Sequence, residues 1–254
     1  MKLSYAGGGF HGWQSQPNAS SVQQTLEEAL STILRAPTAI VGAGRTDAGV
    51  HARMMYAHFD VDTERAARIV ADKQRFLIGL NRLVGHDIAV QDIIDVADDA
   101  HARFDATSRT YKYFVALEKS PFMQQCAWHC TMPLDVNLMN QAAELLLGTD
   151  DFTSFAKLHS DAKTNICRVT HARWETWHND FGVPGLLFTI TADRFLRNMV
   201  RAVVGTLVDV GRGKMSLADF RNVIDKKDRC SAGTSMPTQA LFLWEITYGY
   251  KVTD

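Results

Sequence analysis

The chain has 254 residues, of which 46 % are hydrophobic and 22 % are charged, and its formal net charge at pH 7 is −1. This length and apolar content suit one large domain or two closely packed halves, and they exclude an intrinsically disordered chain. No apolar run reaches the roughly 20 residues that span a bilayer, and the first residues lack the apolar core of a signal peptide. We therefore expect a soluble, cytoplasmic protein.

Strand and helix patterns alternate along the first part of the chain. A short strand is expected over residues 1–6, followed by a glycine-containing loop over 7–13. A helix is expected to begin near Val22, because Ser21 and Gln24 have the spacing of a capping box. Further along, the patterns predict a glycine-rich loop at 42–49, a strand at 56–61, a helix at 64–83 and a strand at 88–96.

The second part begins near Phe104 and has a similar mixture of elements. Each part combines strands with crossing helices, which predicts an α+β architecture of two pseudo-duplicated halves, residues 1–104 and 105–254. The expected elements are a strand at 111–117, a helix between Asp135 and Gly148, strands at 168–177 and 186–192, a helix at 196–210, a short helix capped by Ser216 and Asp219, and a strand at 240–248.

Asp47 lies in the most informative segment of the sequence. Three glycines between residues 42 and 49 allow tight backbone conformations, so this loop can push one side chain outward and let a ligand approach closely. The neighbouring Arg45 could keep the Asp47 carboxylate ionised and oriented. The alternative is an Asx turn, in which Asp47 binds nearby backbone amides. Composition alone favours the turn.

The cysteines and histidines give no sign of a metal site. Four cysteines are too few and too scattered for a disulfide framework. The segment 126–130 contains two cysteines and a histidine, but it lacks a second ligand pair, so buried free thiols are expected. The remaining candidates are expected to make hydrogen bonds or contact RNA rather than to act as catalysts: His11, His51, His58 and His101.

Two tyrosines in the second half have the spacing of neighbours on one face of a strand. Tyr111 and Tyr113 are two residues apart and are flanked by the cations Arg109 and Lys112. From the residues alone, both tyrosines are interpreted as packing residues.

A pair of arginines lies on the expected helix at 196–210. Arg197 and Arg201 are four residues apart, so both lie on one side of the helix, which is typical of a solvated cationic face. However, Arg201 is next to Val200 and one turn from Gly205, so part of its side chain could be buried. A buried guanidinium requires a carboxylate partner.

The glycine-rich segment resembles a family signature. Residues 44–52, Gly-Arg-Thr-Asp-Ala-Gly-Val-His-Ala, are similar to the signature of the tRNA pseudouridine synthase A family. The resemblance covers nearly the whole chain, through residues 10–14, 16–18, 22–23, 101–104, 109–113, 128–129, 133–135, 151–155, 195–201 and 205. The sequence departs from the family pattern at Ala6, Met55 and Ala240, which concerns contacts to RNA rather than the catalytic groups.

The resemblance implies a fold, an activity and three catalytic residues. The fold would be that of pseudouridine synthases, with two pseudo-symmetric α/β halves that share a central, mainly antiparallel sheet with a catalytic cleft. The activity would convert uridine to pseudouridine at positions 38, 39 and 40 of the tRNA anticodon arm, without a cofactor or metal. Asp47 would be the nucleophile, Tyr111 would stack on the base or transfer a proton, and Arg201 would form an ion pair with Asp47.

The resemblance also implies partners, and two other functions remain open. The protein would be a homodimer in which one tRNA touches both subunits, and no membrane is involved. The expected RNA contacts are Arg45, Arg103, Arg109, Lys112, Arg168 and Arg197. One alternative is a non-catalytic tRNA-binding or RNA-chaperone module of the same fold. Another is a hydrolase that uses Asp47 as a general base, but it lacks a partner acid or metal at a recognisable spacing.

Overall fold

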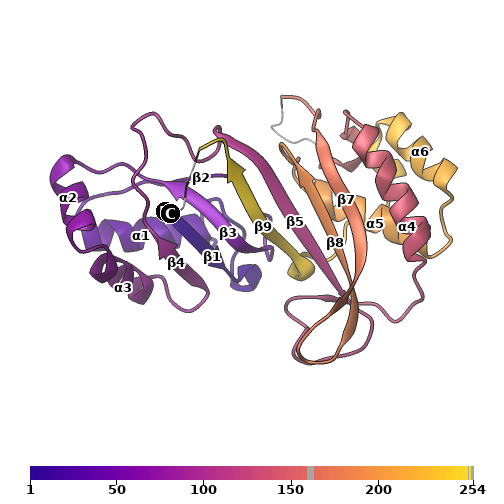
Figure 1. Ribbon diagram of the computed structural model, residues 1–254, viewed down its shortest axis with the longest axis horizontal. Coiled ribbons are helices and arrows are strands. Elements are labelled where there is room, and N and C mark those ends of the chain that lie inside the picture. Colours follow the sequence, from indigo (N-terminus) through magenta and orange to yellow (C-terminus); the bar gives the residue numbers. More distant parts are fainter. Residues whose placement is uncertain (159–162, 251, 253–254) are drawn as a thin grey trace. The chain divides into compact units, whose positions relative to one another are not determined.

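The computed structural model describes residues 1–158, 163–250 and 252 (Figure 1). It divides into two compact units: the first contains Met1–Thr107 and Leu243–Asp254, and the second contains Ser108–Phe242. Both units combine helices with mainly antiparallel strands, so the α+β class is confirmed. The functional division into 1–104 and 105–254 stays a prediction, and the last strand of the chain returns to the first unit.

The first unit is built on strands in the order β4-β1-β3-β9. The β1–β3 and β1–β4 pairs are antiparallel, and the short β2 pairs antiparallel with β3. Helix α3 packs against β4 and against α1. The elements are β1 (Lys2–Tyr5), η1 (Gly7–Gly9), α1 (Val22–Leu34), β2 (Val41–Gly42), β3 (His51–His58), α2 (Thr63–Ala71), α3 (Lys73–Leu83), β4 (Ile88–Asp92) and β9 (Leu241–Tyr248).

Two boundaries in the first unit differ from the sequence prediction. The strand expected at 56–61 runs instead from His51 to His58, directly after the Asp47 loop. Its buried residues come in runs, at 51–52 and 55–57, and do not alternate, so the period-two pattern does not show where the strand begins. The helix expected at 64–83 is two helices separated at Asp72. This residue has a non-helical backbone (φ −144°, ψ 62°), and its side chain accepts a hydrogen bond from the Arg75 amide. Asp72 therefore ends one helix and begins the next.

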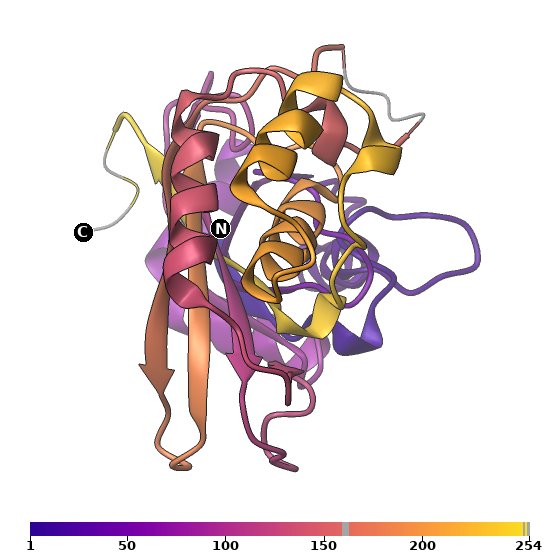
Figure 2. The same ribbon diagram turned by 90° about the vertical axis from the view of Figure 1, so that its right-hand side faces the viewer.

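The second unit contains the antiparallel strand order β5-β8-β7, and the short β6 lies parallel to β5. Helix α4 packs against β7 and α5, and α6 packs against α4 and α5 (Figure 2). The elements are β5 (Ala106–Ala116), β6 (Trp128–His129), α4 (Val136–Glu144), η2 (Leu145–Gly148), η3 (Thr153–Phe155), β7 (Val169–His178), β8 (Pro184–Ala192), α5 (Met199–Gly211), α6 (Leu217–Lys226), η4 (Arg229–Ser231) and η5 (Thr238–Ala240).

The outermost strand of each unit is held by an asparagine from a helix. In the first unit, Asn81 of α3 donates to the Val90 carbonyl at 2.8 Å and accepts from the Val90 amide at 2.8 Å. In the second unit, Asn140 of α4 donates to the Trp174 carbonyl at 3.0 Å and accepts from the Trp174 amide at 2.8 Å. Each side-chain amide thus binds the outward-facing backbone groups of an edge strand as another strand would.

No helix among the described residues has the length and apolar character that are needed to cross a membrane.

The buried side chains of the second unit include Trp174 and Phe188, whose ring centroids are 5.0 Å apart. Helix α4 therefore contributes to stability through apolar packing and through its two hydrogen bonds to β7.

The contribution of the Asn140 bridge can be measured with a matched pair of substitutions on α4. Asn140→Ala leaves the Trp174 amide and carbonyl without their side-chain partner, and we expect the free energy of unfolding to fall by about 1–3 kcal/mol. Asn137→Ala alters an exposed residue of the same helix, and its effect should stay within about 0.5 kcal/mol. Urea unfolding followed by circular dichroism measures both. Equal effects of the two substitutions would contradict the bridge.

Candidate active site

The turn that carries Asp47 lies between β2 and β3 in the first unit. The Val50 amide donates to the Asp47 carbonyl at 3.1 Å, and the Gly49 amide donates to the Phe10 carbonyl at 3.3 Å. An Asx turn would require the Asp47 carboxylate to accept the Gly49 amide. This amide is instead bound to Phe10, so the Gly49 and Val50 amides of the turn both bind backbone carbonyls.

The glycine-containing loop at 7–13 packs against the Asp47 turn. The Trp13 amide donates to the Thr46 carbonyl at 3.2 Å. Gly12 has φ +96°, and a Cβ atom at this position would lie 2.6 Å from the Thr46 carbonyl oxygen. Only glycine permits this close approach of the two backbones. The loop at 7–13 therefore fixes the position of the residue that precedes Asp47.

Side chains anchor both ends of the turn. Thr46 is buried, and its Oγ1 lies 2.8 Å from the hydroxyl of Tyr5 on β1. At the other end, His51 is buried at the start of β3, and its Nδ1 accepts the Gly7 amide at 3.1 Å. Asp47 itself is half-buried between these two anchors. His51 thus acts as a hydrogen-bonding residue of the loop, in agreement with the expectation for it.

In the second unit, Arg201 is oriented by the segment that precedes β9. Its Nε donates to the Met236 carbonyl at 2.6 Å, and the Met236 amide donates to the Arg201 carbonyl at 3.1 Å. The next carbonyl, that of Pro237, accepts the hydroxyl of Tyr113 at 3.1 Å. Tyr113 is fully buried, as expected for a packing residue. Arg201 and Tyr113 are therefore fixed by neighbouring carbonyl groups.

Tyr111 lies on the same face of β5 as Tyr113, two residues away. Its ring meets the ring of Phe195 edge to face, with centroids 5.0 Å apart. Phe195 lies just before α5, the helix that carries Arg201. The structure thus brings Tyr111 and Arg201 to the same side of β5 within the second unit.

The segment at 233–237 was not identified from the sequence as part of a site. Arg229 Nη2 and Asn198 Nδ2 both donate to Ser235 Oγ, at 2.9 Å and 2.7 Å. Arg229 Nη1 also donates to the Gly233 carbonyl at 3.1 Å. These bonds hold the segment against the start of α5. Little in the sequence marks this segment, because it binds its neighbours mainly through backbone carbonyls, which every residue carries.

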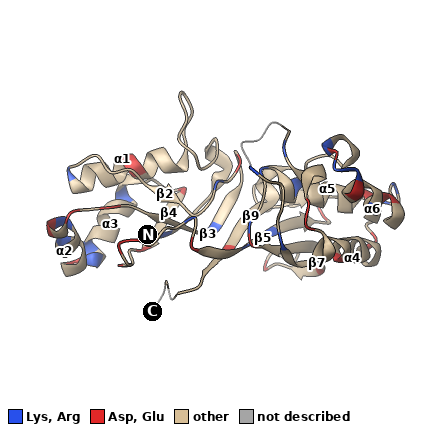
Figure 3. Ribbon diagram, turned by 90° about the horizontal axis from the view of Figure 1, so that it is seen from above, with Lys and Arg blue, Asp and Glu red and all other residues tan. Residues whose placement is uncertain are grey.

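The expected RNA-binding cations differ in exposure. Arg109 and Lys112 on β5 are half-buried, and Arg109 Nη1 donates to the Asp193 carbonyl at 2.8 Å. The other four are exposed: Arg45, Arg103, Arg168 and Arg197. In both units, Lys and Arg are interspersed with Asp and Glu (Figure 3). Among the described residues, the six expected RNA-binding cations therefore do not form a patch of purely positive charge in either unit.

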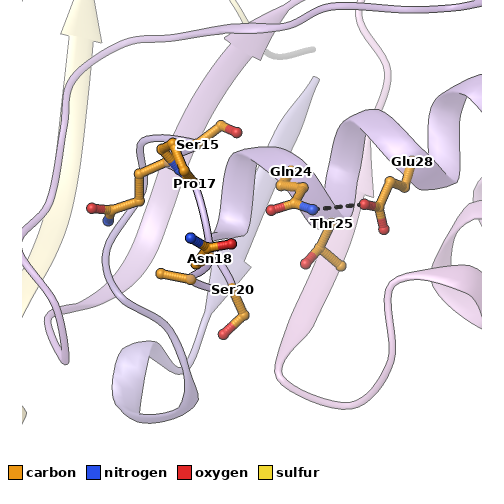
Figure 4. A pocket seen from close by; sticks show the side chains of 9 residues that line it. Ser15, Pro17, Asn18, Ser20, Gln24, Thr25 and Glu28 are labelled. Carbon is orange, nitrogen blue, oxygen red and sulfur yellow. Dashed lines mark hydrogen bonds between the residues drawn. The ribbon is translucent and has the colours of Figure 1, made fainter.

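A polar hollow of about 720 Å³ lies beside the start of α1 (Figure 4). The loop at 15–20 forms one side, and Gln24, Thr25 and Glu28 of α1 form the other. Gln24 Nε2 donates to Glu28 Oε1 at 2.9 Å across the helix surface. This hollow belongs to the opening segment of the chain, and its lining does not include the Asp47 turn.

Within the residues that the structure describes, no group of three or more His, Cys, Asp or Glu side chains is arranged to hold a metal ion. Of the four cysteines, Cys130 and Cys167 are buried, Cys126 is half-buried and Cys230 is exposed. Burial raises the pKa of the Cys167 thiol to about 12. Cys167 is therefore protonated and unreactive at neutral pH.

Comparisons with known proteins point to a single family. A family model described as tRNA pseudouridine synthase matches residues 142–249. A protein of Parabacteroides distasonis named tRNA pseudouridine synthase A is 54 % identical over 246 residues, which cover 97 % of this chain and 94 % of that protein. The protein of the same name from Porphyromonas gingivalis is 52 % identical over 246 residues, with 97 % and 95 % covered. That from Bacillus subtilis is 39 % identical over 252 residues, with 97 % of each covered.

The buried Tyr113 predicts a change of stability at alkaline pH. Burial raises the pKa of Tyr113 above its ordinary value of 10.0, although the charge of Arg201 acts in the opposite direction. Above pH 10 the folded protein therefore keeps a proton on Tyr113 that the unfolded chain releases. The contribution of this residue to the free energy of unfolding is complete below pH 10 and is lost as the pH rises further. In Tyr113→Phe, the alkaline decline should be shallower by about 1.4 kcal/mol per pH unit. Urea unfolding at several alkaline pH values tests this, and identical slopes would contradict it.

Proposed function

Because the chain belongs to the tRNA pseudouridine synthase A family, we propose that it converts uridine to pseudouridine in tRNA. The observation that carries this proposal is the identity of 54 % with a protein of that name, over 97 % of the chain. The relatives bear the name of an enzyme, which favours catalysis over a non-catalytic RNA-binding or chaperone module. The Asp47 turn, in which the Gly49 and Val50 amides bind backbone carbonyls, suits the presentation of a reactive carboxylate.

The reaction rearranges bonds without adding or removing atoms. The bond between N1 of uracil and the anomeric carbon breaks, the base turns, and C5 forms a new bond to the same carbon. The proton on C5 leaves, and N1 gains one, so the product is an isomer of the substrate. Because there is no net oxidation or reduction, side chains that hold the base, supply a nucleophile and move a proton are sufficient.

Asp47 is proposed as the nucleophile. Its carboxylate would attack either C6 of the uracil ring or the anomeric carbon as the base departs, and both routes give a covalent intermediate that later collapses. Asp47 is half-buried between Thr46 and His51, whose own side chains are anchored by hydrogen bonds, and this fixed position supports the role.

Tyr111 and Arg201 are proposed to act with Asp47. The ring of Tyr111 would stack on the extruded base, or its hydroxyl would take part in the transfer of the C5 proton. Arg201 would form an ion pair with Asp47 and keep it anionic. Since Nε of Arg201 is bound to Met236, its two Nη groups are the donors that would face the carboxylate.

The proposed substrate sites are the uridines at positions 38, 39 and 40 in the anticodon arm of tRNA. A target in a stem must be extruded, at a cost of a few kcal/mol, and duplex RNA is recognised mainly through its shape and phosphates. The six cations proposed for this role are Arg45, Arg103, Arg109, Lys112, Arg168 and Arg197. Following the family resemblance, we further propose a cytoplasmic homodimer that acts without a metal and without a membrane.

The role of Asp47 is tested with tRNA that carries tritium at C5 of uridine. Asp47→Asn removes the nucleophile and keeps the shape of the side chain, so release of tritium should fall by at least about three orders of magnitude. Binding of tRNA should persist. Asp95→Asn, at an exposed carboxylate in the same unit, is the matched control and should release tritium at the wild-type rate. Full release by Asp47→Asn would refute the assignment.

The role of Arg201 is tested by separating catalysis from folding. Arg201→Met removes the charge, and Arg201→Lys keeps it but loses the planar fork that can bind Met236 and a carboxylate together. We expect single-turnover rates to fall at least about tenfold in both variants, with little change in the affinity for tRNA. Thermal melting identifies any unfolded variant. A folded Arg201→Met protein with wild-type turnover would contradict the proposed ion pair.

A further inference from the structure

Phe104 is the most exposed large apolar side chain in the described part of the chain, with 76 % of its surface accessible. It lies in the loop between β4 and β5, within the first unit. Burying a phenylalanine typically contributes about 1.5–3 kcal/mol. A single exposed ring is not unusual by itself, so the surroundings of Phe104 decide whether it has a function.

The ring of Phe104 is one member of a short aromatic stack. Its centroid lies 4.3 Å from that of His101, with the planes inclined by 31°. On its other side, His101 meets His58 of β3, with centroids 4.7 Å apart. The guanidinium carbon of Arg103 lies over the Phe104 ring, 5.8 Å from its centroid. An exposed aromatic ring is thus in contact with a second ring and with a cation.

The loop that presents Phe104 is fixed by its own hydrogen bonds. Nδ1 of His101 accepts the amides of Arg103 and Phe104 at 3.1 Å and 3.2 Å. The His101 amide donates to the Asp105 carboxylate at 2.7 Å. These bonds place the ring before any ligand binds, so little conformational entropy is lost on binding.

Contacts from β3 and from the end of the chain add to this rigidity. Nδ1 of His58 accepts the Ala102 amide at 3.1 Å, and the Ala102 carbonyl accepts the hydroxyl of Tyr248 at 2.7 Å. The hydroxyl of Tyr250 donates to the Asp105 carboxylate at 3.1 Å. Burial, reinforced by the neighbouring His101, lowers the pKa of His58. A neutral His58 keeps its acceptor nitrogen for the loop.

We propose that Phe104, supported by His101 and flanked by Arg103, is a platform on which one unpaired base of the bound RNA stacks. This inference rests on the proposed function, because it takes tRNA as the ligand. Unpaired bases are bound in many RNA complexes by stacking on aromatic rings, while arginines contact the adjacent phosphate. The combination of a rigid exposed ring and a neighbouring guanidinium matches that chemistry.

The stacked base is a different nucleotide from the target uridine. Asp47 precedes the first residue of β3, His51, whereas the platform rests on the last residue, His58. Seven steps along a strand correspond to about 23 Å. The platform therefore contributes to the affinity and placement of the RNA, and the chemical step at Asp47 does not depend on it.

A second exposed aromatic pair provides a matched control. Phe122 and Phe181 in the second unit are 68 % and 61 % exposed, and their rings stack on each other with centroids 5.1 Å apart. In this pair each ring covers a face of the other, so the two phenylalanines already stack on each other without a ligand. Phe122→Ala therefore removes a comparable exposed ring without removing the platform.

The test measures tRNA binding and turnover for Phe104→Ala, Phe104→Trp and Phe122→Ala. Phe104→Ala should weaken the binding of tRNA about 5- to 150-fold, and the single-turnover rate of tritium release at saturating tRNA should remain that of the wild type. Phe104→Trp, which restores a stacking surface, should bind within about twofold of the wild type. Phe122→Ala should not change either quantity.

Abasic substitutions in the tRNA identify stacking as the cause. Replacing the unpaired nucleotides one at a time should reveal a position where loss of the base weakens binding to the wild type but not to Phe104→Ala, since the two changes remove the same contact. Unchanged affinity of Phe104→Ala overturns the inference. So does a change in the sedimentation of Phe104→Ala without tRNA, which would make the ring a contact between copies of the chain. If the wild type neither binds tRNA nor releases tritium, the proposed function itself fails.

Discussion

The structure depends on how the turn around Asp47 satisfies its backbone. The Gly49 amide binds the Phe10 carbonyl and the Val50 amide binds the Asp47 carbonyl. The flanking residues Thr46 and His51 are buried, and their side chains are hydrogen-bonded. A carboxylate that formed the turn would be held by backbone amides and would be a weaker nucleophile. Gly12 allows the loop at 7–13 to pack against the Asp47 turn, because a side chain at this position would collide with the Thr46 carbonyl. The proposed reactivity of Asp47 would thus depend on the backbone packing around it.

In both units an asparagine from a helix binds the backbone of the edge strand, but the two units carry different candidate catalytic residues. Asn81 and Asn140 each bind both backbone groups of one edge residue, which relates the units more clearly than any repeat in the sequence. On this common framework, the first unit presents the Asp47 turn. The second presents Tyr111 on β5 and Arg201 on α5, with Arg201 aligned by the Met236 carbonyl. The proposed reaction needs both sets of groups.

Much of the fold could be predicted from the sequence, whereas the roles of Asp47, Tyr111 and Arg201 stay predictions. The capping residues Ser21, Asp135 and Ser216 all accept the expected amide hydrogen bonds, because a cap depends on neighbours within three residues. The break at Asp72 was missed, because a residue that caps two helices interrupts the apolar period only slightly. The roles of Met236 and Pro237 could not be predicted, since they act through carbonyl groups that every residue carries, at positions set by tertiary packing.

The most direct measurement is an experimental structure of the protein bound to a tRNA anticodon arm. We expect an extruded uridine whose C6 or anomeric carbon lies about 3–3.5 Å from a carboxylate oxygen of Asp47. The guanidinium of Arg201 should be bonded to the same carboxylate, and the ring of Tyr111 should lie against the base. A target uridine still stacked in its stem, or extruded into a site without Asp47, would contradict these roles.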